Sequence, residues 1–349
     1  MNRIRAGIIG CGGITWSKHI PAFKKIRKQV DLVSVCDKNE DLARKTAEQF
    51  RIPHSYSNLS EMLSRERISL LDICVPPAVH STIALEGIDN GCHILMEKPM
   101  ALSVSECDKM IEGARAKGVK LCVIHNDLFH PPFIKARELV RNGSIGEFVG
   151  MRIYLSTPHD DMIDIENHWY HRLPGGVIGE TGPHVAYMAL AFIKNIKNVD
   201  INASSRLNLS WAKHDDFWIG IEGENGFCSA GLSYSRNTWE ATVDIFGTDA
   251  SLHIDLEQML VIRKRLEQLR YGSIASLSIG TIFQMICGLS TNAIKTILGT
   301  QRIGTDAIIE AFVNSIMRNT DPPVTGEDGR ETVRLMERIV TKYKEKYPM

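Results

Sequence analysis

A glycine-rich turn near the start of the chain constrains its fold more than any other feature. The apolar run Ala6–Ile9 leads directly into Gly10, Gly12 and Gly13. A strand, a glycine turn and then a helix is the order in which a chain brings backbone N–H groups close to the pyrophosphate of a dinucleotide. The pattern predicts such a binding unit, with the main chain from Gly10 through Ile14 against the cofactor.

A carboxylate follows the second strand-like run. Asp37 comes directly after Leu32–Cys36. At this position a carboxylate accepts hydrogen bonds from both ribose hydroxyls of the adenosine and repels a 2′-phosphate. Asp37 therefore favours NAD over NADP, while the neighbouring Lys38 keeps NADP open as the alternative.

The first third of the chain alternates between strand-like and helical patterns. The strand-like runs are Ala6–Ile9, Leu32–Cys36, Leu70–Val75, His93–Met96 and Val119–Ile124. The helical patterns include Asp41–Phe50, Leu59–Arg65, Ser81–Asn90 and Val104–Lys117, the last opened by the capping box Ser103-x-x-Glu106. Apolar strands separated by helices indicate a parallel sheet covered on both faces. We expect an α/β, doubly wound Rossmann domain over residues 1–125.

The pattern changes beyond residue 125, where strands follow one another without intervening helices. The expected strands are Phe148–Leu155, Val199–Leu209, Phe217–Glu222, Phe227–Tyr234, Trp239–Phe246, Ser251–Ile254 and Met259–Arg263. The expected helices are Phe133–Arg141, Pro183–Phe192, Asp306–Met317 and Glu327–Lys346. This pattern predicts an α+β domain over residues 126–349 with a mostly antiparallel sheet, its last helix able to pack back on the first domain.

Composition narrows the class of protein. At 349 residues the chain is long enough for two domains, and its 41 basic and 41 acidic residues give zero net charge, which argues against a nucleic-acid partner. The first residues run straight into a strand and leave no room for a signal peptide. The eight cysteines form no C-x-x-C pair and several lie in apolar runs. We therefore expect reduced core thiols in a cytoplasmic protein, with no zinc cluster and no other metal site.

One long window has no charged residue, from Arg270 to Lys295. Its apolar residues recur at helical spacing and fall near one face: Ile279, Ile282, Phe283, Ile286, Ala293, Ile294 and Ile297. Too many polar groups and glycines interrupt it for a spanning helix. We favour a helix packed on the sheet or on a second subunit. The alternative is a helix over residues 274–298 that lies on a membrane surface.

Two motifs lie at the edge of the first sheet where ligands of such folds bind. Val75, Pro76 and Pro77 close one strand, and the two prolines stiffen the lip of the crevice. Glu97-Lys98-Pro99 follows the next strand. We expect Lys98 to point towards the cofactor and to take part in proton transfer.

The second domain carries a cluster of ionisable residues at a glycine-rich helix start. Glycines surround it at positions 175, 176, 179 and 182. If the helix begins near Glu180, then Glu180, His184 and Tyr187 share one face. A carboxylate, an imidazole and a phenol in this arrangement could form a proton-handling site, although a packing role is equally open.

Two further segments are candidates for substrate contact. Asn126 follows the last strand of the first domain and could bind nicotinamide or substrate hydroxyl groups. Trp169 and Tyr170 could stack on a sugar ring, and Arg172, with its histidine neighbours, could bind hydroxyls or a phosphate. A structural role is equally open for both segments.

Together these motifs resemble the Gfo/Idh/MocA oxidoreductases, the glucose-fructose oxidoreductase and inositol dehydrogenase group. The resemblance rests on five segments spread over nearly the whole chain: Gly10-Cys11-Gly12-Gly13-Ile14, Val75-Pro76-Pro77-x-x-His80, Glu97-Lys98-Pro99, Gly175-Gly176 with Gly182-x-His184, and Pro323 to Gly329. It implies an N-terminal Rossmann domain and a C-terminal domain whose large open sheet forms homodimer or homotetramer contacts. It also adds His80 and Glu97 to the expected cofactor contacts.

The resemblance also assigns roles to single residues. It implies that Lys98 sits beside the nicotinamide, that the Lys98–Pro99 bond is cis, and that His184 meets the substrate hydroxyl. Members of the family usually carry Asp where this chain has Glu180 and Tyr187. Glu180 keeps the negative charge and reaches one methylene further, whereas Tyr187 loses a carboxylate.

These observations predict an NAD(P)-dependent dehydrogenase of a sugar, a polyol or a sugar derivative. Lys98 and His184 would move the hydroxyl proton from two domains across one cleft, with Glu180 orienting the histidine. One alternative is a nucleotide-sugar dehydrogenase of glycan biosynthesis, which would need a diphosphate site such as one at Arg172. The other is a non-catalytic NAD(P)-binding regulatory protein.

Overall fold

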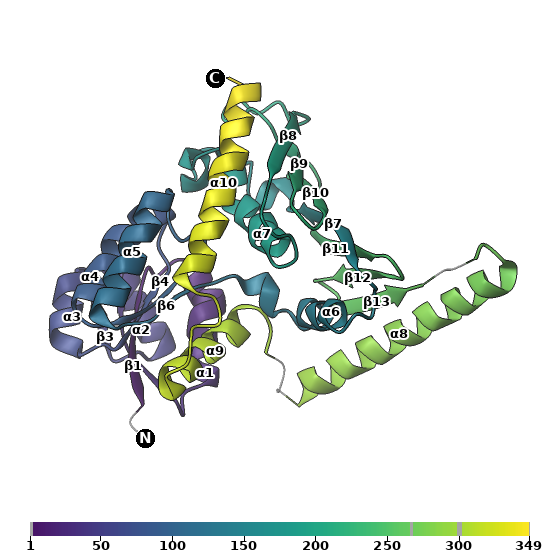
Figure 1. Cartoon of the computed structure of the whole chain (residues 1–349). Coiled ribbons are helices and arrows are strands. Elements are labelled where there is room, and N and C mark those ends of the chain that lie inside the picture. Colours follow the sequence, from purple (N-terminus) through teal and green to yellow (C-terminus); the bar gives the residue numbers. More distant parts are fainter. Residues whose placement is uncertain (1–2, 266–267, 299–301, 349) are drawn as a thin grey trace. The chain divides into compact units, whose positions relative to one another are not determined.

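The computed structural model describes residues 3–265, 268–298 and 302–348, and the chain forms two compact units. The first unit comprises Met1–Asn126 and Gly304–Arg334, and the second comprises Asp127–Ile303 and Leu335–Met349. Figure 1 labels the elements of both.

The first unit is built on a parallel six-stranded sheet with the order β3-β2-β1-β4-β5-β6. Its strands are β1 (Ile4–Ile9), β2 (Val30–Cys36), β3 (His54–Tyr56), β4 (Leu70–Ile73), β5 (His93–Met96) and β6 (Leu121–Val123). The strand order reverses between β1 and β4, which is the switch point where doubly wound sheets bind ligands. The expected Rossmann topology is confirmed, and the three-residue β3 is the one strand of this sheet absent from the expected set.

Helices connect these strands: α1 (Ile20–Lys25), α2 (Glu40–Phe50), α3 (Leu59–Glu66), α4 (His80–Asp89) and α5 (Val104–Lys117). A π-helical segment, η1 (Thr15–His19), precedes α1, and short 3-10 turns lie at η2 (Pro77–Val79) and η3 (Asn126–Phe129). The capping box at α5 is confirmed. The side chain of Ser103 accepts a hydrogen bond from the N–H of Glu106, and the side chain of Glu106 accepts one from the N–H of Ser103. Each helix begins after the carboxyl end of the preceding strand, so its first turn limits a loop at the edge where such sheets bind ligands.

The chain returns to the first unit after the second. Helix α9 (Thr305–Arg318) contacts α1 and buries an apolar face of Ile308, Ile309, Phe312 and Val313. An ion pair joins Lys25 to Asp306. The boundary expected from the sequence placed residues 304–334 in the second domain and allowed the last helix to pack back on the first. The structure assigns Gly304–Arg334 to the first unit.

The second unit contains a seven-stranded sheet with the order β13-β12-β11-β7-β10-β9-β8. Its strands are β7 (Phe148–Ser156), β8 (Asn198–Ser204), β9 (Asp216–Glu222), β10 (Phe227–Ser233), β11 (Glu240–Gly247), β12 (Ser251–Asp255) and β13 (Leu260–Lys264). All neighbours pair antiparallel except β7 and β10, which pair parallel. The expected mostly antiparallel sheet is confirmed.

Helices cover one face of this sheet and leave the other open. Helix α7 (Ile178–Leu190) contacts β10, and α6 (Pro131–Arg141) contacts β12 and β13. Two 3-10 turns, η4 (His159–Asp161) and η5 (Trp169–Arg172), precede α7, and α10 (Gly326–Lys346) ends the chain. On β9, buried and exposed residues alternate from Phe217 to Glu222, as expected for a sheet covered on one side.

Helix α8 (Tyr271–Ile297) is the longest helix of the second unit and contacts β13 (Figure 1). None of its residues is buried. By length and composition it is the one helix in the described part of the chain that could cross a membrane, with a mean hydropathy of 1.5 over its most apolar window. The sequence favoured a helix packed on the sheet or on a second subunit. Helix α8 does contact β13 of the sheet, but its apolar stripe is exposed within the described part of the chain.

Candidate cofactor and catalytic site

The glycine turn after β1 combines one strained position with two open ones. Gly10 has a φ of +96°, and a Cβ there would lie 2.4 Å from the carbonyl oxygen of Cys74, so only glycine fits. A Cβ at Gly12 or Gly13 would meet nothing within 4 Å. The hydroxyl of Thr15 donates to the carbonyl of Gly10 over 2.6 Å and fixes the turn. The exposed backbone at Gly12 and Gly13 fits the pyrophosphate of a dinucleotide.

The carboxylate of Asp37 lies against this same turn. Its Oδ2 accepts from the N–H of Cys11 over 2.8 Å, and its Oδ1 accepts from the N–H of Asn39 over 2.9 Å. Asp37 is half-buried, whereas Lys38 and Ile14 are exposed. The carboxylate is therefore fixed beside the turn, as a ribose-binding group in this fold must be.

His80 is a brace rather than a cofactor contact. Its ring is fully buried, with Nε2 lying 2.8 Å from the carbonyl oxygen of Val75 and Nδ1 lying 3.0 Å from that of Pro99. Burial lowers the pKa of His80. The prediction that His80 contacts the cofactor is wrong for this arrangement, because main-chain carbonyls occupy both ring nitrogens. Pro77 is buried as well, and Pro76 is exposed at the lip.

The Lys98–Pro99 peptide bond is cis, as the family resemblance implied. Lys98 is half-buried, and its backbone N–H donates to Oε2 of Glu97 over 3.2 Å. The other carboxylate oxygen, Oε1, lies 2.9 Å from Nε2 of His19. Glu97 therefore ties the segment that carries Lys98 to a buried histidine, and a direct role of Glu97 with the cofactor stays a prediction.

A buried cluster of charged groups centres on His19. Its Nδ1 lies 2.7 Å from Oδ2 of Asp72 and 3.2 Å from Sγ of Cys74. Burial alone would lower the pKa of His19, but the charges and hydrogen bonds of its partners, above all Asp72, raise that pKa well above its ordinary value. Burial likewise would raise the pKa of Glu97, yet His19 and then Lys98 hold it below the ordinary value. His19 is therefore an imidazolium held between two carboxylates.

Sequence reasoning missed this cluster. His19, Asp72 and Glu97 lie far apart in the chain and join only because β1, β4 and β5 are neighbours in the sheet. Each of the three residues follows or lies within an element that the sequence did predict. The one sign of the cluster in the sequence was that these polar residues lie in or next to apolar runs.

In the second unit, three side chains meet at α7 and η3. Nδ1 of His184 lies 2.7 Å from Oδ2 of Asp127, and the hydroxyl of Tyr187 lies 2.6 Å from the same Nδ1. The Tyr187 hydroxyl also donates to Oδ2 of Asp127 over 2.7 Å. Tyr187 is buried, and the side chains of His184 and Asp127 are mostly so. The predicted grouping of His184 with Tyr187 is present, and Asp127 is the member that sequence reasoning did not assign.

The carboxylate of Asp127 fixes the protonation of this cluster. Burial alone would raise its pKa, but His184, His130 and the Tyr187 hydroxyl hold the pKa of Asp127 well below its usual range. An ionised carboxylate beside Nδ1 favours the tautomer with the proton on Nδ1. The second ring nitrogen, Nε2, is then the atom that can take up a proton from a bound hydroxyl.

Glu180 lies one helical turn before His184. Its Oε2 accepts from the hydroxyl of Thr181 over 3.0 Å. The sequence assigned to Glu180 the task of orienting His184. In the described contacts Asp127 holds Nδ1 of His184, so Asp127 takes over that task and the catalytic role of Glu180 stays a prediction.

The segment from Trp169 to Arg172 forms the short turn η5. Tyr170 is only 4% exposed, its hydroxyl donates to the carbonyl of Met162, and its ring packs 4.1 Å from that of His168. Burial raises the pKa of Tyr170 to about 12. The prediction that Tyr170 stacks on a sugar is therefore wrong for this arrangement, because its ring lies inside the unit. Trp169 is half-buried and Arg172 is exposed, so both keep a surface for a ligand.

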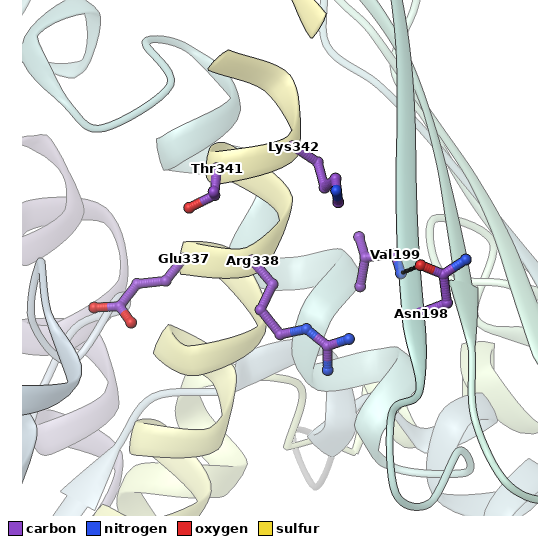
Figure 2. A pocket seen from close by; sticks show the side chains of 6 residues that line it. All are labelled: Asn198, Val199, Glu337, Arg338, Thr341 and Lys342. Atoms are coloured by element: carbon purple, nitrogen blue, oxygen red, sulfur yellow. Dashed lines mark hydrogen bonds between the residues drawn. The ribbon is translucent and has the colours of Figure 1, made fainter. Parts of the chain in front are cut away.

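A separate groove lies between β8 and α10 in the second unit. Figure 2 shows its lining, Asn198, Val199, Glu337, Arg338, Thr341 and Lys342. Both terminal nitrogens of Arg338 donate to main-chain carbonyls over 2.9 Å, and Lys342 pairs with Glu345. The groove contains none of the residues that the sequence singled out, and its cations already have partners. We do not assign the catalytic site to it.

A Rossmann unit with an open glycine turn, joined to an α+β unit with a histidine–carboxylate cluster, defines the class of NAD(P)-dependent oxidoreductases. Family models extend this to the sequence: residues 4–125 match the oxidoreductase family with an NAD-binding Rossmann fold, and residues 133–253 match the GFO/IDH/MocA C-terminal domain. The chain belongs to the Gfo/Idh/MocA family.

Three similar proteins illustrate the range of the family. The chain is 28% identical over 260 residues to the uncharacterized oxidoreductase YrbE of Bacillus subtilis, which covers 72% of this chain and 74% of the relative. It is 23% identical over 339 residues to myo-inositol 2-dehydrogenase of Thermotoga maritima, covering 95% and 94%. The crystal structure of the WlbA dehydrogenase from Bordetella pertussis in complex with NADH and UDP-GlcNAcA aligns with a TM-score of 0.79 at 16% identity, covering 99% and 98%. The last likeness shows the shared fold.

Proposed function

We propose that the protein transfers a hydride between a nicotinamide cofactor and a hydroxyl-bearing carbon of a sugar, polyol or sugar derivative. The observation that carries the proposal is the cluster of Asp127, His184 and Tyr187. Oxidation of an alcohol removes a proton from oxygen as the hydride leaves carbon, and His184 can accept that proton at Nε2 because Asp127 holds Nδ1. When bound, the cofactor supplies the hydride acceptor.

Lys98 has the second role in this proposal. An ammonium group next to the substrate oxygen stabilises the negative charge that develops there when the proton leaves. The hydrogen bond from its N–H to Glu97 fixes the backbone of Lys98. In the reverse direction, reduction of a ketone, His184 returns the proton and Lys98 again stabilises the negative charge on the oxygen.

We assign NAD rather than NADP to the protein, because Asp37 lies against the glycine turn as a fixed, half-buried carboxylate. The exposed Lys38 is the one feature in favour of NADP. The inositol dehydrogenase of Thermotoga maritima supports a cyclic polyol or sugar as the substrate class.

The test is turnover. Purified protein is incubated with NAD and one candidate substrate at a time, taken from inositols, free sugars and UDP-linked sugars. NADH formation is followed. We expect oxidation of at least one of these compounds. His184→Asn and Lys98→Met should each lower kcat by about 10²-fold or more while NADH binding is retained. Matched controls are His54→Asn and Lys117→Met, two partly exposed side chains on the first unit.

Other outcomes separate the alternatives. Turnover of UDP-linked sugars alone would make the substrate a nucleotide sugar. Arg172 would then be the candidate contact for its phosphates. Tight NADH binding with no turnover of any member would overturn the proposed activity and favour a regulatory, cofactor-binding protein.

The proposal includes a cytoplasmic homodimer or homotetramer that forms through the second unit. Seven of the eight cysteines are buried and none of the eight is in a disulfide, which suits a reducing compartment. The open face of the sheet carries the exposed aromatic side chains expected of an interface between subunits.

A further inference from the structure

Helix α8 turns its more polar, small-residue face towards the protein. Gln284 bonds to both the N–H and the carbonyl of Arg263 on β13, and Asn292 donates to the carbonyl of Met259 over 2.9 Å. Between them Gly288 approaches the side chain of Leu260. These three residues recur every four positions, so they lie on one face of the helix.

The opposite face is apolar and exposed. It carries Ile279, Ile282, Phe283, Ile286, Ala293, Ile294 and Ile297. Ile279 is 68% exposed, Phe283 is 67% exposed and Ile297 is 83% exposed. A helix of a soluble protein normally buries such a stripe and shows its polar face to water, so α8 has the reverse arrangement. Something outside the chain must cover this stripe.

The charged residues that flank α8 in the sequence are mainly basic. Between Glu257 and Asp306 the chain has six basic residues and one acidic residue, Glu267. The basic residues flank the uncharged helix: Arg263, Lys264, Arg265, Arg270, Lys295 and Arg302. A second copy of the chain would bring the same positive charge to the contact, whereas an anionic surface would be attracted to it.

The helix cannot cross a bilayer as a single span. The first unit joins segments from before and after α8, residues 1–126 and 304–334, in one fold. Within the second unit, His214 likewise bonds to Tyr343 over 2.7 Å, on either side of α8 in the sequence. A single span would put these partners on opposite sides of the membrane. The helix must lie parallel to any bilayer that it contacts.

From these observations we propose that α8 binds the surface of an anionic lipid bilayer, with its apolar stripe in the headgroup and acyl boundary and its basic flanks against lipid phosphates. The polar side chains at Gln284 and Asn292 stay on the protein side, bonded to β13. The amphipathic stripe and the basic flanks are together the two signals that such peripheral binding requires. The proposal is independent of the proposed catalytic activity.

The test is co-sedimentation of the full chain with vesicles of phosphatidylcholine alone and of phosphatidylcholine with about 30% phosphatidylglycerol. We expect binding to the anionic vesicles, weakened by added salt. The double variant Ile279→Ser/Phe283→Ser should lower the partition coefficient by about 10-fold or more. The matched control, Trp239→Ser, removes an exposed apolar side chain of the same unit that is not part of α8 and should bind as the wild type does.

Circular dichroism and the thermal unfolding midpoint check that the double variant is folded, since its two side chains are exposed and their loss should leave both unchanged. Two results would overturn the proposal. One is wild-type protein that stays in the supernatant with anionic vesicles. The other is a molar mass in solution that falls in the double variant, which would show that a second copy of the chain covers the stripe.

Discussion

At the scale of single residues, the carboxylate of Asp127 decides what His184 can do. It lies 2.7 Å from Nδ1 and stays ionised because its pKa is held well below the usual range by His184, His130 and Tyr187 against the effect of burial. Without this charge, either ring nitrogen of His184 could carry the proton. Asp127 thus acts on the substrate through another residue, as a positioning group.

We therefore predict that Asp127→Asn keeps the fold and NADH binding but lowers kcat by about 10²-fold to 10⁴-fold, the range for loss of an orienting carboxylate. The physical reason is that the amide no longer fixes the proton on Nδ1. Steady-state kinetics and an NADH titration measure the two effects. Asp200→Asn, on an exposed side chain of β8, is the control. A variant with the kcat of the wild type would remove Asp127 from the mechanism.

His19 gives a prediction about stability and pH. Its folded-state pKa lies above the ordinary value of about 6.5, so its contribution to the free energy of unfolding is fully present below that pH. It is lost as the pH rises through the folded pKa. Replacing His19 leaves Asp72 and Glu97 as buried carboxylates without their cation, at a cost of about 3 kcal/mol or more.

We predict that His19→Asn is destabilised at neutral pH and that its difference from the wild type shrinks as the pH rises. Urea unfolding of both proteins between about pH 6 and pH 9 measures this difference. His54→Asn, which changes a partly exposed histidine of the same unit, should show no such trend. A constant difference across the range would mean that His19 is buried without its positive charge.

The sequence predicted the local pair of the site but not the pairs between residues far apart in the chain. His184 and Tyr187 are three positions apart on one helix, so helical geometry brought them together. Asp127 lies 57 residues from His184, and no local rule connects them. His80 and Tyr170 were assigned to ligands from a motif and from residue type, and burial gave both of them structural roles.

At the scale of helices and strands, the regular elements were predictable from their hydrophobic periodicity, but the residues at which they begin and end were not. Strand β9 was expected at Phe217–Glu222 and is Asp216–Glu222, but β8 was expected to reach Leu209 and ends at Ser204. The carboxylate of Asp215 accepts from the N–H groups of Arg206 and Leu207, which turns the chain away from the sheet. Helix α7 begins at Ile178, earlier than expected, because it tolerates Pro183 within its first turns.

The open face of the second sheet gives a prediction for this element. Trp218 and Phe227 are about half exposed there, and the Tyr154 ring lies 6.1 Å from that of Trp218. Gly150 and Gly231 leave room for these rings, because a Cβ at either position would collide with them. The result is an exposed aromatic surface, which suits contact with another sheet.

We predict that Trp218→Asp/Phe227→Asp lowers the molar mass in solution from that of a dimer or tetramer to that of one chain, because it puts carboxylates into the contact. Size exclusion with light scattering measures the mass. Ile134→Asp, on the exposed side of α6, is the control and should leave the mass unchanged. A wild-type protein that is already a monomer, or a variant of unchanged mass, would exclude this face.

At the scale of the whole molecule, alternation of strands and helices followed by consecutive strands predicted both architectures. The sequence allowed the last helix to pack back on the first domain, but the return of α9 to the first unit was not predictable from that order. It depends on the apolar face of α9, and a helical stripe in the sequence does not show which unit it will cover. The same limit applies to α8, whose stripe shows helical periodicity but is exposed among the described residues.

Cofactor binding should therefore stabilise the molecule unevenly. The glycine turn and Asp37 belong to the first unit, which also contains α9, so a bound dinucleotide stabilises residues from both ends of the chain. At a free concentration 100 times its Kd, a ligand adds about 2.7 kcal/mol to the free energy of unfolding of the unit that binds it. The unfolding transition of the first unit should rise accordingly.

We predict that NADH raises this transition more than NADPH does at equal concentration, because the Asp37 carboxylate repels the 2′-phosphate. Asp37→Ser should reduce the shift with NADH and increase that with NADPH. Differential scanning calorimetry of both proteins with each cofactor measures the four shifts, and Asp41→Ser, an exposed carboxylate in α2, is the control. A wild-type protein stabilised more by NADPH would assign the binding of a 2′-phosphate to Lys38 and would change the cofactor of the proposed reaction.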